Sequence, residues 1–92
     1  AIVVVDGAVV GEGRNRVEEL RSPLAHAEML ALQQALVHAG NKRLANATLY
    51  CSLEPCFLCA GAILHARVDR VVFGASDPKF GAVRSLANVL ED

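Results

Sequence analysis

Residues 48–67 read TLYCSLEPCFLCAGAILHAR, and this stretch decides the fold because it places two cysteines three residues apart where a strand turns into a helix. Thr48 to Leu53 is apolar and β-prone, and Pro55 suits the first turn of a helix because its missing N–H would be unpaired there anyway. Residues three apart on a helix share a face, so the sulfur atoms of Cys56 and Cys59 can reach one metal ion. The positive end of the helix dipole also favours thiolates. The stretch therefore predicts half of a zinc site.

Outward from this stretch, the pattern of apolar residues predicts strands and helices in the order β-β-α-β-α-β-α. The pair Asp6-Gly7 between two apolar runs is a strong hairpin signal. Such an order implies right-handed crossovers and a parallel pair in a mixed sheet. Because the strands are almost continuously apolar, we expect helices on both faces of the sheet or a partner surface on one of them. The expected strands are 2–5, 8–10, 48–53 and 70–74, and the expected helices are 24–39, 56–66 and 85–90.

Local signals set the ends of the first long helix. Ser22-Pro23 supplies a plausible N-cap and first helical position, and Gly40 ends the helix. Residues 11–21 before it are polar and are expected to form a loop long enough to be functional. Residues 75–84 are expected to form a second loop.

The bulk composition narrows the class of protein. The 92 residues predict a single domain, 1–92, and 53% hydrophobic content with few aromatics indicates an aliphatic core. A formal charge of −1 argues against broad, non-specific nucleic-acid binding, although a local basic patch remains open. No apolar run approaches the roughly 20 residues that span a bilayer, so we expect no membrane partner. Three cysteines with one Cys-x-x-Cys pair suit a reducing compartment, so we expect a cytoplasmic protein.

The other half of the zinc site is expected at the start of the first long helix. Helix residues two apart point in different directions, so Glu28 should lie beside a metal held by His26 without ligating it. With Cys56 and Cys59, His26 completes three ligands of the types that zinc prefers, and a fourth position left to water is the mark of a catalytic site. Two thiolates and a neutral imidazole cancel the charge of Zn²⁺, so the water is only partly activated by the metal. Glu28 is then placed for general acid–base work.

Together, His-x-Glu at 26–28 and Pro-Cys-x-x-Cys at 55–59 match the signature of zinc nucleobase deaminases. The similarity implies an α/β, cytidine-deaminase-like three-layer fold, with a mixed sheet of about four strands and a zinc site between two helix N-termini. A closer resemblance, to bacterial tRNA-specific adenosine deaminases, runs through GEGRNR (11–16), AHAEMLAL (25–32), residues 47–79 and SLANVL (85–90). That closer resemblance implies a homodimer that hydrolyses adenosine to inosine at the wobble position of a tRNA anticodon.

Carried over residue by residue, the resemblance implies that His26, Cys56 and Cys59 bind one zinc ion. It implies that Glu28 moves the proton during attack on adenine C6, and that Asn15 hydrogen-bonds the flipped base. The further substrate contacts that it implies are Ala27, Pro55, Asp77 and Lys79, the last two in a loop that meets the nucleotides flanking the target.

The sequence also departs from the family. Members usually begin with a helix before the first strand and end with a further strand and a long helix, whereas this sequence is shortened at both ends. Three residues have ordinary alternative roles. Asn15 could form an Asx turn, Asp77 before Pro78 is a common turn pair, and Cys51 is expected to be a small buried apolar residue without a catalytic role.

Two other functions compete with tRNA editing. One is a deaminase of a free nucleobase or nucleoside, of the guanine or cytosine type. The other is a non-catalytic, zinc-stabilised subunit of an active partner. SLANVL and the SDPK loop (76–79) favour a tRNA anticodon loop or another single-stranded nucleic acid as the substrate, and the presence of Glu28 argues against the non-catalytic subunit.

Overall fold

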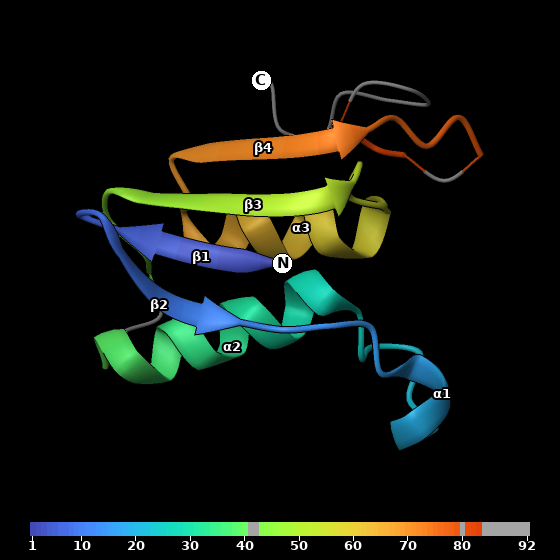
Figure 1. Ribbon diagram of the computed structural model, residues 1–92, viewed down its shortest axis with the longest axis horizontal. Helices are drawn as coiled ribbons and strands as arrows, with labels where there is room; N and C mark the ends of the chain where they lie inside the picture. Colours follow the sequence, from blue (N-terminus) through green and yellow to red (C-terminus); the bar gives the residue numbers. More distant parts are fainter. Residues whose placement is uncertain (41–42, 80, 84–92) are drawn as a thin grey trace.

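A computed structural model describes residues 1–40, 43–79 and 81–83, which form a four-stranded mixed sheet with helices packed against it (Figure 1). The strand order is β2-β1-β3-β4, and β1 runs antiparallel to both β2 and β3. The hairpin of β1 with β2 and the parallel pair of β3 with β4 are as the sequence predicts. The strands are β1 (Ile2–Val5), β2 (Ala8–Glu12), β3 (Ala47–Leu53) and β4 (Arg70–Ala75), and the helices are α1 (Val17–Leu20), α2 (Ala27–Ala39) and α3 (Phe57–Ala66).

The first hairpin forms where the sequence predicts it. Asp6 and Gly7 both have positive φ, 50° and 79°, which is the backbone that the two central residues of a type I′ turn require. Strand β2 continues to Glu12, two residues beyond the prediction, because Glu12 pairs with Ile2 across a register shift next to Val3.

The start of α2 is where the sequence-based prediction is wrong. The helix begins at Ala27 with His26 as its N-cap, three residues later than expected. The Ser22 hydroxyl accepts the Leu24 N–H at 3.2 Å, so it closes a separate turn before the helix. The Ala25 carbonyl accepts the Arg16 N–H at 2.9 Å, a contact within the loop before the helix. The expected loop 11–21 contains the short helix α1.

Helix α3 begins at Phe57 with Cys56 as its N-cap, so Pro55 precedes the helix and does not lie in its first turn.

At the C-terminal end of α2, Gly40 takes the left-handed conformation (φ 64°) that the sequence predicts. The backbone N–H of Gly40 closes the helix on the carbonyls of Leu36 and Val37.

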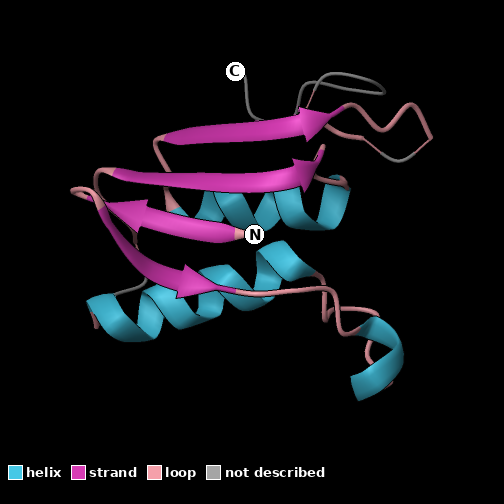
Figure 2. Cartoon of the chain, in the orientation of Figure 1, coloured by secondary structure: helices cyan, strands magenta, loops and turns pink. Residues whose placement is uncertain are grey.

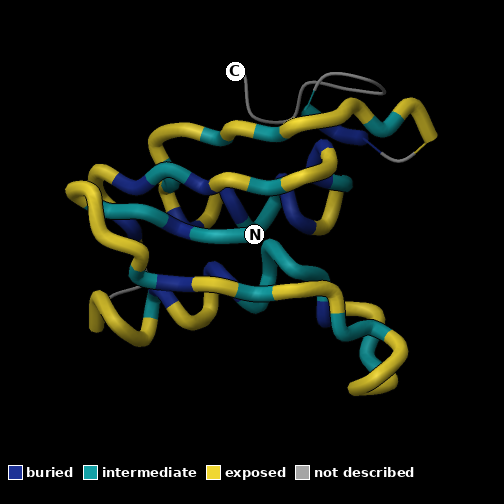
Figure 3. The backbone as a smooth tube through the Cα atoms, in the orientation of Figure 1, coloured by how far each residue is buried: buried dark blue, intermediate teal, exposed yellow. Residues whose placement is uncertain are grey.

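The core lies between the sheet and one layer of helices. Val3 and Leu49 on adjacent strands pack with Leu32 of α2 and Ile63 of α3 in one buried cluster. In the described part of the chain both long helices cover this same face (Figure 3). Val3 in β1 and Ala47 and Leu49 in β3 are buried beneath them, whereas β4 has only intermediate and exposed residues. The mixed sheet and its class are as predicted, but no helix among residues 1–40, 43–79 and 81–83 forms a layer on the second face. The expected helix 85–90 lies outside the described residues.

None of the helices in the described ranges is long and apolar enough to cross a membrane.

Candidate active site

The starts of α2 and α3 meet at the edge of the sheet where β3 and β4 end (Figure 2). The two helices pack against each other and point their N-termini to this edge. Carboxyl ends of parallel strands are the usual place for ligand sites in α/β sheets, and helix N-termini stabilise negative charge. The fold thus gathers the two sequence motifs at one end of the molecule.

His26, Cys56 and Cys59 form a three-residue group whose ligand atoms all lie within 4.8 Å of one another. His26 Nδ1 lies 3.8 Å from Cys56 Sγ. Tetrahedral zinc with ordinary bond lengths sets a nitrogen and a sulfur ligand roughly 3.6 Å apart, so the donor set and its spacing fit zinc. Within the described residues, no further histidine, cysteine or carboxylate belongs to this group.

The ligand side chains differ in burial. Cys59 is fully buried, whereas His26 and Cys56 are partly exposed. Burial raises the pKa of the Cys59 thiol well above its usual range, and the charges of Glu28 and Cys56 raise that pKa further. The raised pKa favours the neutral thiol of Cys59. A bound cation favours the thiolate instead, so metal binding at this group releases protons.

Cys51 is the third thiol near the site, and it stays outside the ligand group. It is half-buried, a little more open than the sequence predicts. Burial, and secondarily the charge of Glu28, raise the pKa of Cys51 to about 11. Its sulfur lies 3.7 Å from the Val72 carbonyl on the neighbouring strand.

An open cleft of about 790 Å³ lies over the ligand group. His26, Glu28 and Cys56 line it, so the carboxylate expected beside the metal faces the same space as two of the ligands. Exposed Phe57 and Leu58 contribute apolar surface. The remaining lining residues are Ala1, Gly13, Arg14, Asn15, Ala27, Ser52, Leu53, Glu54 and Asp77.

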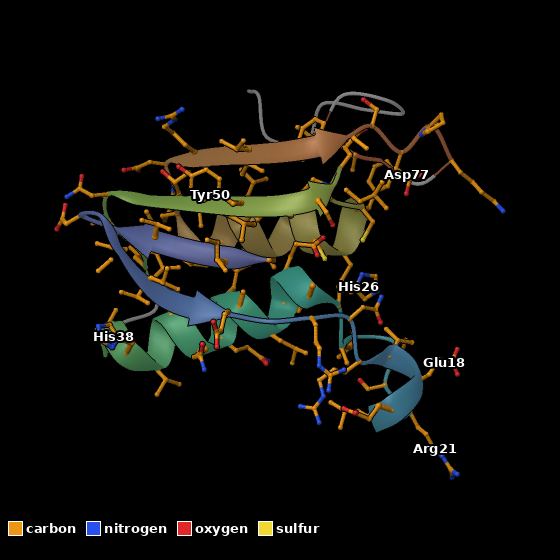
Figure 4. All side chains as sticks on the ribbon, in the orientation of Figure 1. Glu18, Arg21, His26, His38, Tyr50 and Asp77 are labelled. Atoms are coloured by element: carbon orange, nitrogen blue, oxygen red, sulfur yellow. The ribbon has the colours of Figure 1, made fainter. Side chains whose placement is uncertain are left out.

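The structure brings three of the expected substrate contacts to the cleft and leaves two outside its lining. Asn15, Ala27 and Asp77 line it. Pro55 is fully buried beside the cleft, and Lys79 is exposed beyond Asp77. Figure 4 shows His26 and Asp77 on different segments at the same end of the molecule.

Asn15 and Asp77 also make the local hydrogen bonds that the alternative interpretation describes. The Asn15 side-chain oxygen accepts the Val17 N–H at 3.0 Å, and an Asp77 carboxylate oxygen accepts the Lys79 N–H at 3.1 Å. These bonds orient both side chains in the cleft wall, so the turn role and a place in the cleft coexist.

Glu54 is the site residue that the sequence interpretation missed. Its side chain is only 2% exposed, although it is charged and immediately precedes the Pro-Cys pair. One carboxylate oxygen accepts the Asp77 N–H at 3.0 Å and the other accepts the Val83 N–H at 3.1 Å. The available signal was an acidic residue between an apolar strand and Pro55, since charged residues are rarely buried without a paired role.

The sequence matches a family model described as MafB19-like deaminase over residues 1–91. It is 46% identical to the tRNA-specific adenosine deaminase of Streptococcus pyogenes serotype M1, over 99% of this chain and 53% of that relative. It is 50% identical to the tRNA-specific adenosine deaminase of Haemophilus influenzae, over 98% of this chain and 53% of that relative. The chain therefore spans about half the length of these curated relatives.

Solved structures resemble the fold closely. One comes from work on A-to-I editing by tRNA:A34 deaminases at the wobble position of transfer RNA; its TM-score is 0.88 at 46% identity, covering 91% of this chain and 61% of that one. The guanine deaminase of Bacillus subtilis gives a TM-score of 0.77 at 40% identity, covering 82% of this chain and 48% of that one. The cytidine-deaminase-like fold that the motifs imply is thereby confirmed.

Proposed function

This chain belongs to the MafB19-like deaminase family, and from that premise we propose that it is a zinc-dependent hydrolase that converts adenosine to inosine in nucleic acid, at the wobble position of a tRNA anticodon. The observation that carries the proposal is the group of His26, Cys56 and Cys59 beneath an open cleft that Glu28 also lines. Three protein ligands with room for a fourth, and a carboxylate facing the same space, are the parts of a hydrolytic metal site.

In this proposal His26, Cys56 and Cys59 hold one zinc ion per chain. When bound, zinc lowers the pKa of a water molecule and so supplies a nucleophile at neutral pH. Glu28 takes up one proton of the attacking water and passes it to N1 of adenine, and the second proton of the water goes to the leaving amino group, so that ammonia departs and oxygen replaces it at C6. Its position two residues after His26 keeps Glu28 off the metal and free to move that proton.

The cleft wall supplies the proposed substrate contacts. A base that is flipped out of its strand is read by hydrogen bonds to its edge and by stacking on side chains. Asn15 and Ala27 lie where such a base would enter, and Asp77 stands on the wall. Lys79, exposed on the same segment, offers a cation for a neighbouring phosphate. Pro55 is fully buried and lies outside the lining of the cleft.

The substrate we propose is a tRNA anticodon loop or another single-stranded nucleic acid, and its support is the identity of 46% and 50% to tRNA-specific adenosine deaminases. The family resemblance also supports the proposed homodimer. All three cysteines are free, which suits a reducing compartment, so we propose that the protein acts in the cytoplasm.

A second candidate function is deamination of a free nucleobase, and the similarity to the guanine deaminase of Bacillus subtilis favours it. The third, a non-catalytic zinc-stabilised subunit, has less support because Glu28 is present and the cleft above the ligand group is open. The three functions differ in which substrates are turned over.

The test is a side-by-side deamination assay of the zinc-loaded protein on an anticodon stem-loop RNA, single-stranded DNA of matching sequence, and free adenosine, guanine and cytidine. The proposal expects inosine in the RNA and little turnover of the free compounds. Turnover of a free base alone would establish the second candidate. No turnover by a protein with one zinc per chain would indicate the non-catalytic subunit.

A further inference from the structure

We propose that Glu54 is a positioning residue, whose buried carboxylate fixes the Asp77 segment (residues 76–79 and 81–83) so that Asp77 forms one wall of the cleft. Glu54 connects strand β3 to the metal ligand Cys56, and the Asp77 segment follows strand β4. The inference rests on the proposed function for its effect on substrate, and on the contacts below for the anchoring itself.

The carboxylate of Glu54 holds the segment at two separated points. Its two oxygens accept the backbone N–H groups of Asp77 and Val83 at 3.0 and 3.1 Å. An ionised carboxylate only accepts hydrogen bonds, and here each oxygen has a backbone donor. Charge-assisted bonds of this kind are stronger than neutral ones, and burial away from water strengthens them further.

The segment closes tightly on this carboxylate. A Cβ atom built at Gly81 would collide with the carboxylate carbon and both oxygens of Glu54. Gly81 is itself buried. A residue with any side chain at this position would have to push the segment or the carboxylate aside, so the absence of a side chain at Gly81 is what allows the two hydrogen bonds.

Backbone contacts join the same two parts of the chain. The Glu54 N–H donates to the Ala75 carbonyl at 2.8 Å, and the Ala82 N–H donates to the Pro55 carbonyl at 2.9 Å. Cys56 forms an isolated bridge with Gly81. Residues 54–56 therefore hold Asp77 in place relative to the ligand group. Their backbone makes these contacts, and the Glu54 carboxylate adds side-chain bonds to the same segment.

A buried carboxylate with a purely structural role would affect folding and metal retention, and a positioning role predicts a different result. If Glu54 acts through the cleft wall, its loss should weaken substrate binding while Glu28 and the zinc ligands keep their geometry. KM should then rise with little change in kcat. The effect on KM should also be non-additive with that of a change at Asp77, because both changes act through the same contact between the Asp77 side chain and the substrate.

The experiment uses the zinc-loaded protein with Glu54→Gln, Asp77→Ala and both together, assayed on the anticodon stem-loop RNA. Gln keeps the volume of Glu but replaces one acceptor oxygen with an amide that faces a backbone donor. We expect each single change to raise KM about tenfold, the effect of losing one good hydrogen bond, and the double change to raise it about tenfold as well. Glu18→Gln is the matched control, because Glu18 projects from α1 into solvent (Figure 4) and should change nothing.

Several results would overturn the proposal: multiplied KM effects in the double variant, a loss of zinc, a fall in kcat at constant KM, or no change at all. If Glu54→Gln does not fold, Gly81→Ala displaces the same carboxylate from the opposite side and should give the same KM rise.

Amide hydrogen exchange provides a readout that needs no substrate. The Asp77 and Val83 amides should exchange faster in Glu54→Gln than in the wild type, while amides of β3 keep their protection. If the wild type deaminates nothing, the proposed function fails, and this comparison still decides the anchoring. Unchanged protection of both amides would refute it.

Discussion

The starts of α2 and α3 are built alike but carry different chemistry. Each helix has a potential metal ligand as its N-cap, His26 in α2 and Cys56 in α3, and neither side chain makes a capping hydrogen bond. The next polar group differs in spacing: Glu28 comes two residues after His26, and Cys59 three residues after Cys56. Three residues bring a second ligand to the same ion, whereas two residues place a carboxylate beside it.

Burial follows the same division. Cys59 is fully buried and does not line the cleft, while Glu28 is partly exposed and does. Cys59 of α3 therefore lies on the closed side of the ligand group, whereas Glu28 of α2 faces the open cleft. Damage to α3 should cost the metal, and damage to Glu28 should cost only the chemistry.

The largest effect should come from Cys59→Ala. Loss of a residue that only hydrogen-bonds a metal ligand lowers metal affinity by up to about 100-fold. Losing one of the three ligands themselves should lower zinc affinity by more than that, and activity should disappear with the metal. Zinc per chain after dialysis against a weak chelator measures this. Cys51→Ala is the matched control, because Cys51 lies nearby but outside the ligand group, and it should keep its zinc.

Glu28→Gln should lower kcat by roughly 10²- to 10⁴-fold, the usual contribution of a general acid–base group, without loss of zinc. Metal analysis and steady-state kinetics on the stem-loop RNA check this together. Wild-type turnover in the variant would remove the distinction between the two helix starts.

Asn15→Ala should have a smaller effect, because Asn15 lines the cleft but lies outside the ligand group, and its proposed role is a single hydrogen bond to the substrate. Loss of one substrate hydrogen bond should lower kcat/KM about tenfold at constant zinc content. The same variant loses the bond to the Val17 N–H, so circular dichroism should confirm that the fold is retained. An effect as large as that of Glu28→Gln would give Asn15 a part in the chemistry.

The smallest effect concerns pH and Cys51. Its pKa is raised from 9.0 to about 11 in the folded protein, so the thiol ionises first in the unfolded chain. The stability that this thiol contributes is fully present below pH 9 and is lost as pH rises through 11. Urea unfolding of the metal-free protein between these pH values should show this loss, and Cys51→Ala should reduce it. An identical pH dependence in the variant would mean that other groups cause the loss.

The parts of the site that could be predicted from sequence depend on short spacings. The Cys-x-x-Cys and His-x-Glu pairs define their own geometry once a helix forms, and Asp6-Gly7 defines its own turn. The start of α2 differs from the prediction because Ser22, the expected N-cap, closes a turn of its own, and the Ala25 carbonyl accepts a hydrogen bond from the Arg16 N–H.

The role of Glu54 was missed for a related reason. Its partners Asp77 and Val83 lie 23 and 29 residues further along the chain, so no local pattern reveals them. Local signals therefore predict the group of His26, Cys56 and Cys59. The contacts of Glu54 with Asp77 and Val83 join distant parts of the chain, and local sequence patterns do not reveal them.

The most direct test of the account is zinc X-ray absorption spectroscopy of the metal-loaded protein. A site held by His26, Cys56 and Cys59 with an open position predicts two sulfur ligands, one imidazole nitrogen and one further light atom supplied by water. A third sulfur would bring Cys51 into the site, and a second imidazole would close the open position. Either result would contradict a site in which two helix starts hold the metal and leave one position for the reaction.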